Sequence, residues 1–171
     1  MRVATRAKTQ STRARWGARL LGAGLTTAAA LGFAAAPALA AAVTPVIVPG
    51  NPAPVCPDGS TALRVDPSDS GTTFPVSIPG DGSGTITPTF HSAPGLGPNT
   101  LVDFTTTGDI AVSQVTVKGG PNANRYIYGP PAFPNGIADD TNLVSPINPG
   151  GQVPTISHVD FCFTPSNYHT T

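Results

Sequence analysis

The sequence predicts an all-β protein, a small disulfide-linked β-sandwich of about seven short strands that follows a helical signal peptide. Beyond residue 41, no segment has the 3.6-residue periodicity of a helix, whereas several short runs alternate apolar and polar residues. Glycine and proline, 19 and 20 residues of the chain, are concentrated between these runs and mark turns. A small barrel is the alternative architecture.

The first 40 residues have the pattern of a secretory signal peptide. Six basic residues and no acidic residue precede an apolar stretch at 20–36, and the sequence Ala38-Leu39-Ala40 then supplies a cleavage motif. We expect cleavage between Ala40 and Ala41. A retained membrane anchor is the alternative, but this stretch is at the lower limit of spanning length and is rich in small residues.

Removal of residues 1–40 changes the charge of the chain. The nine Lys and Arg residues balance nine acidic residues, all of them Asp, but six of the basic residues lie in the leader. The remaining three, Arg64, Lys118 and Arg125, leave a net charge of −6. This balance argues against binding to nucleic acid and against attachment to an anionic membrane after cleavage.

Residues 41–55 are predicted to form an extended linker, because prolines at 45, 49, 52 and 54 exclude a helix. Residues 56–165 are expected to form a single β domain, and residues 166–171 a tail. The first strand is expected at 61–66, where Leu63 and Val65 alternate with Arg64. The next two, at 74–78 and 85–91, flank a glycine-rich turn and predict a hairpin.

The second half of the domain has the clearer strands. Residues 101–107 place Val102 and Phe104 on one face, and residues 111–118 alternate throughout, with Val112 expected opposite Val115. Two glycines then lead to a strand at 125–128, and the closing strand at 156–163 carries an apolar face opposite Asp160. Residues 129–154 are expected to be a long loop with a short extended piece at 143–147.

The two cysteines are expected to form a disulfide. Cys56 and Cys162 are the only pair in a chain with an export signal, and exported thiols oxidise. The bond would join the start of the domain to its last strand. A free, reactive Cys162 near His158 is the alternative.

Three segments, VTVKGGPNANRYIY (115–128), SPINPGG (145–151) and ISHVDFCF (156–163), form a block in the second half of the chain. This block resembles one near the end of secreted proteins of actinobacteria, to which no activity is attached. The resemblance implies secretion and a β fold. It implies no catalytic residue.

The best candidate binding patch consists of Arg125, Tyr126 and Tyr128. The tyrosines share one face of their strand, and paired aromatic rings on an exposed sheet can stack on sugars or form a protein interface. The alternative is that one or both tyrosines fill the core.

Metal binding and catalysis have weaker candidates. Asp139, Asp140 and Asn142 supply oxygens that make a weak candidate site for Ca²⁺, and a solvated loop explains them more simply. We expect no cofactor. A hydrolase could use carboxylates between Asp58 and Asp160, or the pair His158 and Asp160, which share a strand face.

We therefore expect a secreted, extracellular or cell-wall-associated protein that acts as a structural or binding module and not as an enzyme. Its partner would be an extracellular protein or glycan. A small extracellular hydrolase that uses Asp and His residues is the alternative function.

Overall fold

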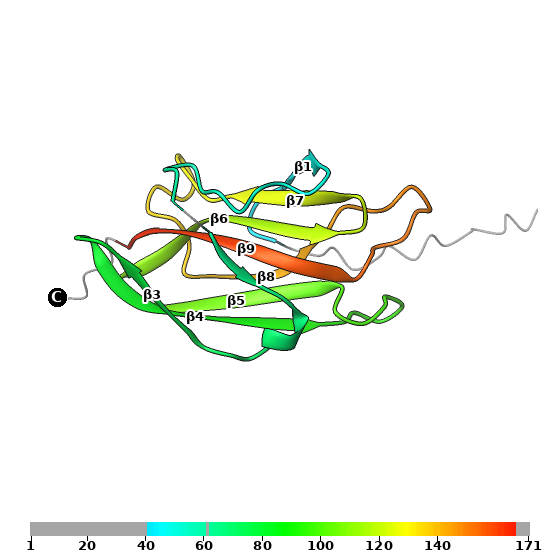
Figure 1. Cartoon of the computed structure of the whole chain (residues 1–171), viewed down its shortest axis with the longest axis horizontal. Helices are drawn as coiled ribbons and strands as arrows, with labels where there is room; N and C mark the ends of the chain where they lie inside the picture. Colours follow the sequence, from blue (N-terminus) through cyan, green and yellow to red (C-terminus); the bar gives the residue numbers. More distant parts are fainter. Residues whose placement is uncertain (1–40, 61, 167–171) are drawn as a thin grey trace, which may run out of the picture. The chain divides into compact units, whose positions relative to one another are not determined.

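A computed structural model describes residues 41–60 and 62–166 of the chain. In this part of the chain, two antiparallel sheets of five and four strands pack as a sandwich, which confirms the predicted fold class (Figure 1). The predicted signal peptide, residues 1–40, and the tail beyond Ser166 lie outside the described residues. Among those residues, no helix has the length and apolar character needed to span a membrane.

The nine strands of the described part divide unequally between the two sheets. The five-stranded sheet has the order β1 (Val46–Pro49), β7 (Asn122–Ile127), β6 (Ile110–Gly119), β9 (Ile156–Pro165) and β2 (Leu63–Val65). The four-stranded sheet has the order β3 (Phe74–Ile78), β4 (Gly82–His91), β5 (Leu101–Gly108) and β8 (Asp139–Val144). A short 3₁₀ helix, Pro67–Asp69, connects β2 to β3 and is capped by Asp66.

The core lies between the sheets. It consists of the side chains that point inward, which alternate with outward ones along each strand. Phe104 of β5 and Phe161 of β9 meet across it edge to face, with ring centroids 5.5 Å apart. Val102 and Phe104 point inward as predicted, and so do Val159 and Phe161. The apolar alternation that is visible in the sequence therefore identifies most of the inward positions of these two strands.

A β-bulge in β6 corrects one detail of the predicted alternation. Val112, expected on the face opposite Val115, lies in the same core because the register shifts between Val112 and Gln114. Ser113 is the extra residue, and its carbonyl oxygen accepts a hydrogen bond from the Tyr128 N–H. The bulge thus allows apolar side chains on both sides of it, in a strand of ten residues, to point into the core.

Two strands occur where the sequence predicted linker or loop. Residues 46–49, placed in the extended linker, form β1 and pair with β7, so Val46 lies opposite Arg125. Residues 139–144, placed in the long loop, form β8 and pair with β5. β1 and β8 are edge strands of their sheets. Of the prolines that suggested a linker, Pro45 precedes β1 and Pro49 ends it, because an edge strand tolerates residues that cannot donate a backbone hydrogen bond.

The predicted disulfide between Cys56 and Cys162 is present. Cys162 lies on the outward face of β9, since Phe161 beside it points into the core. The segment between β1 and β2 is therefore tied over the outer surface of the five-stranded sheet. Cys56, Ala62 and Cys162 form a second small buried cluster there. The outward side chains of Gln114 and Thr116 on β6 are also buried.

Candidate functional site

The two tyrosines of the predicted binding patch are buried, with exposed fractions of 1% for Tyr126 and 2% for Tyr128. Tyr126 of β7 and Tyr128, which directly follows β7, do share a face, as expected, but that face is the inner one. Tyr126 accepts from the N–H of Val144 at 2.9 Å and donates to the carbonyl of the same residue at 3.0 Å. Tyr128 donates to Asp140 at 2.7 Å. The tyrosines therefore tie β7 to β8 and offer no stacking surface to a ligand.

Burial of the tyrosines places their neighbours on the outside of the sheet, since side chains alternate along a strand. Ile127 lies between the two tyrosines and is 53% exposed. Arg125 lies opposite Val46 of β1, and Val46 is 59% exposed. Of the predicted patch, Arg125 alone faces outward, and its neighbours there are aliphatic rather than aromatic.

An apolar groove of about 400 Å³ lies at this same edge of the sandwich. It is formed by the start of the domain, by β7 and by the segment after β8. We call it the edge groove, and its residues are Thr44, Pro45, Ile47, Asn124, Val144, Ser145, Pro146, Ile147 and Val153. Ile47 and Ile147 are 62% and 65% exposed although both are large aliphatic residues. The sequence signal for the groove was the Val-Ile-Val run at 46–48, which the flanking prolines concealed.

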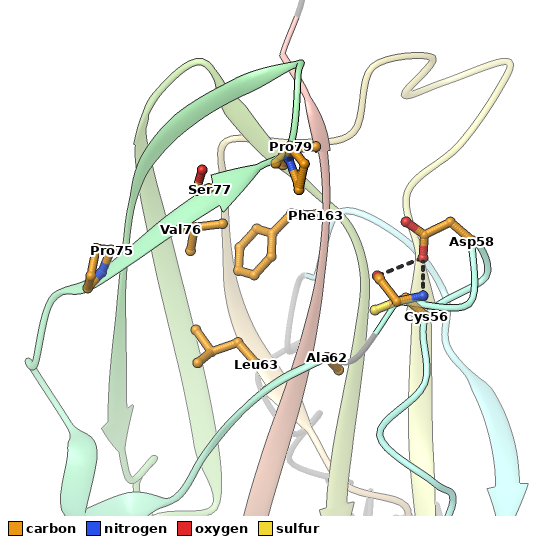
Figure 2. Close-up of a pocket in the computed structure, with 11 residues that line it drawn as sticks. Cys56, Asp58, Ala62, Leu63, Pro75, Val76, Ser77, Pro79 and Phe163 are labelled. Carbon is orange, nitrogen blue, oxygen red and sulfur yellow. Dashed lines mark hydrogen bonds between the residues drawn. The ribbon is translucent and has the colours of Figure 1, made fainter.

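A second cavity of about 280 Å³ opens at the opposite side, near the edge strands β2 and β3. Figure 2 shows the ring of Phe163 facing Val76 and Leu63 in this cavity, with Asp58 at its rim. Asp58 accepts from both the hydroxyl and the backbone N–H of Ser60, and these hydrogen bonds lower the pKa of its carboxyl group. An exposed carboxylate held in this way is a turn-forming acceptor, and it is poorly suited to act as a general acid.

His158 and Asp160, the candidate catalytic pair, do lie on one face of β9, but their partners are structural. Asp160 is 3% exposed and binds Arg64 through two hydrogen bonds, of 2.7 and 2.9 Å. His158 Nε2 lies 4.0 Å from the nearer oxygen of Asp160 and is buried without a hydrogen-bond partner. Burial lowers the pKa of His158, and Arg64 and Lys118 add to this effect while Asp160 opposes it.

This arrangement does not provide a nucleophile with an activating base. Ser157 Oγ lies 3.4 Å from Nδ1 of His158, but the hydroxyl donates to the carbonyl of Lys118. The carboxylate that would orient the imidazole is already occupied by a guanidinium. The geometry therefore gives the hydrolase alternative no support at His158.

The three residues predicted as weak candidates for metal ligands do not converge on one point. Asp140 points inward and is 5% exposed, whereas Asp139 is exposed on the other face of β8. Asn142 has a left-handed backbone, and its N–H donates to Asp103 at 2.7 Å. Within residues 41–60 and 62–166, no three His, Cys, Asp or Glu residues form a cluster that could hold a metal ion.

Comparisons with known proteins found no match to this chain among protein-family models, curated proteins or solved structures.

Proposed function

We propose that this protein is an exported, non-catalytic binding module that holds a partner protein in its edge groove. The observation that carries the proposal is the exposure of Ile47 and Ile147 on the two sides of one apolar depression. Single exposed aliphatic residues are common on protein surfaces, but aliphatic residues that converge on a groove are typical of an interaction site.

Export is supported by two independent features of the chain. The leader has a basic start, an apolar stretch and an Ala-x-Ala motif. The Cys56–Cys162 disulfide is of a kind that persists in oxidising compartments and is rare in the cytosol. Together they favour a protein that acts outside the cell or at the cell wall.

The partner is a protein and not a glycan. The proposal of a glycan depended on stacking against Tyr126 and Tyr128, which are buried. The residues that line the edge groove include no aromatic residue, and its large exposed side chains are Ile47 and Ile147. Such a surface suits apolar side chains of a polypeptide, and the net charge of −6 after leader removal favours a partner that is not acidic.

The partner contacts side chains of β1 rather than extending its sheet. Pro45 and Pro49 flank or end the strand, so only Val46, Ile47 and Val48 carry an N–H in this stretch. These three are shared between β7 and the open edge. An added strand would find few donors there, whereas the groove beside β1 offers a continuous apolar surface.

A photo-crosslinking residue at Gln152, an exposed position beside Val153, can identify the partner in envelope and medium fractions of the producing cell. The purified partner is then titrated against the wild type and against Ile47→Ser with Ile147→Ser. Burial of one isoleucine contributes about 1.5–3 kcal/mol, so we expect affinity to fall at least about tenfold.

Val55→Ser is the matched control, because Val55 is 54% exposed and is not a groove residue. The control should bind like the wild type. Equal affinity of the groove variant and the wild type for every captured protein would overturn the proposal, and so would sedimentation showing that the groove serves only to pair two copies of this chain.

A further inference from the structure

Asp140 is a buried carboxylate with an unusual set of neighbours. It accepts hydrogen bonds from the Tyr128 hydroxyl at 2.7 Å and from the Thr141 N–H at 2.8 Å. The N–H of Ala42 lies 3.0 Å from each of its two oxygens. Among the described residues, the ion pairs involve Asp103 and Asp160, and none involves Asp140.

A buried carboxylate without a cation is costly, even when hydrogen bonds offset part of the loss of hydration. The contact with Ala42 indicates which cation could pair with Asp140. Ala42 is separated by a single residue from the peptide bond at which the sequence predicts leader cleavage. Cleavage there would make Ala41 the first residue of the protein.

The start of the domain is fixed at this position by packing. Ala41 and Val43 are half-buried and lie against the hydrophobic core, on either side of the Ala42 amide. Ala41 therefore cannot swing freely into solvent without losing apolar contacts. Its nitrogen lies within about 4 Å of the Ala42 nitrogen, since three bonds of about 1.3–1.5 Å connect them.

We propose that leader cleavage between Ala40 and Ala41 creates an α-ammonium group that forms an ion pair with Asp140, so that processing completes the fold. In the cleavage, water adds across the peptide bond. Ala40 leaves as a carboxylate, and the amine of Ala41 takes up a proton near neutral pH. The inference rests on the export part of the proposed function and is independent of the edge groove.

The hydroxyl groups that face this ion pair are those of the two tyrosines. Tyr128, which directly follows β7, has its pKa raised by burial and by the adjacent Asp140 carboxylate, so its hydroxyl remains a donor. Tyr126 on the same strand also has a raised pKa, chiefly through burial. Asp139, the neighbour on β8, is exposed on the opposite face of that strand. Each of the two tyrosines is therefore neutral, and the new ammonium would give Asp140 an ion pair that it lacks among the described residues.

The test uses the full chain expressed with its own leader in a secreting host. Intact mass of the protein from the medium identifies the first residue, which we expect to be Ala41. The two amines of that chain, the terminal one and Lys118, are then dimethylated with ¹³C-formaldehyde and titrated by NMR. We expect the terminal amine to titrate above about pH 9, compared with 7.7–8.0 for an unperturbed amine.

Asp140→Asn should return the pKa of the terminal amine to about 7.7–8.0. Asp139→Asn is the matched control and should leave the pKa of the terminal amine raised. If Asp140→Asn does not fold, the wild type unfolded in urea provides the second comparison, because its terminal amine should then titrate in the ordinary range.

The failures are distinguishable. A chain that is retained with its leader overturns both the proposed export and the ion pair. A secreted chain that starts at another residue, or one that starts at Ala41 but has an ordinary terminal amine in the folded state, overturns the ion pair alone.

Discussion

The two buried aspartates of the domain are stabilised by different means. Asp160, on the outer face of β9, binds the guanidinium of Arg64 in a bidentate arrangement. Asp140, on the inner face of β8, is surrounded by N–H and O–H donors. Bidentate pairing fixes both the charge and the geometry of Asp160. As a result, the neighbouring His158 cannot use this carboxylate as a dedicated partner.

His158 should make the stability of the protein depend on pH below about 7. In the unfolded chain the imidazole takes up a proton near pH 6.5, but its pKa is lower in the folded protein, chiefly through burial. Below pH 6.5 the unfolded state thus binds more protons, and the free energy of unfolding falls as the pH falls. Urea denaturation at pH 7.5, 6 and 5 measures this slope.

His158→Gln removes the titrating group and should flatten the slope in this range. Because the side chain of His158 is 16% exposed, the variant should still fold. A slope identical to that of the wild type would contradict the assignment of this pH dependence to His158.

At the scale of single residues, the sequence predicts which side chains share a face better than it predicts where that face points. The alternation at 125–128 correctly placed Tyr126 and Tyr128 together. It could not show that the other sheet covers them, because that depends on β8, which the sequence did not predict. Ile47 and Ile147 were missed for a related reason, since both lie within two residues of a proline in segments interpreted as linker and loop.

At the scale of strands, the sandwich depends on a close approach at the ends of β4 and β5. Gly84 lies opposite Gly108, and Gly108 has φ of +79°, a left-handed conformation that favours glycine. A Cβ at Gly84 would overlap the carbonyl oxygen of Thr107 and press on the side chain of Ile110. The absence of side chains at these two positions thus allows β5 to turn sharply into β6.

Gly84→Ala should therefore destabilise the protein by about 1–3 kcal/mol or more, as expected when a methyl group is forced into a packed site. Urea denaturation midpoints provide the measurement. Gly129→Ala is the matched control, because a Cβ there meets no atom within 4 Å. Similar midpoints for the two variants would show that the contact at Thr107 relaxes without cost.

The strands that the sequence predicted and those it missed differ in composition. β5 and β9 are eight and ten residues long and carry regular apolar alternation, which the core burial follows. β8 has the sequence DDTNLV, and its only buried apolar residue is Leu143. Its pairing with β5 is a long-range contact, so no local pattern could indicate it. The bulge at Ser113 was missed because its extra residue shows only in the pairing with β9, and the sequence around it was interpreted as one uninterrupted alternation.

At the scale of the whole described domain, the disulfide links the segment before β2 to the last strand, across 106 residues of sequence. Almost every strand pairing in the two sheets lies within this covalent loop. The chain-entropy model assigns about 4.7 kcal/mol to closure of a loop of about 100 residues. This contribution is large compared with the net stability of about 5–15 kcal/mol that is typical of small domains.

Cys56→Ser with Cys162→Ser should therefore lower the free energy of unfolding by up to about 4.7 kcal/mol. Treatment of the wild type with a phosphine reductant should have the same effect and add about 2 Da to its mass, the two hydrogens of the broken S–S bond. The same reductant should leave the double variant unchanged. A wild type whose mass and denaturation midpoint do not respond to reduction would contradict the prediction.

The same covalent loop affects how the protein would respond to proteolysis. Exposed turns such as Gly95 and Gly151 are the kind of segment that extracellular proteases cut first. Both turns lie between Cys56 and Cys162, so a single cut in either would leave the two pieces joined by the S–S bond. Such a nicked molecule would remain one covalent unit, and the disulfide would thus protect the protein from fragmentation in addition to stabilising it.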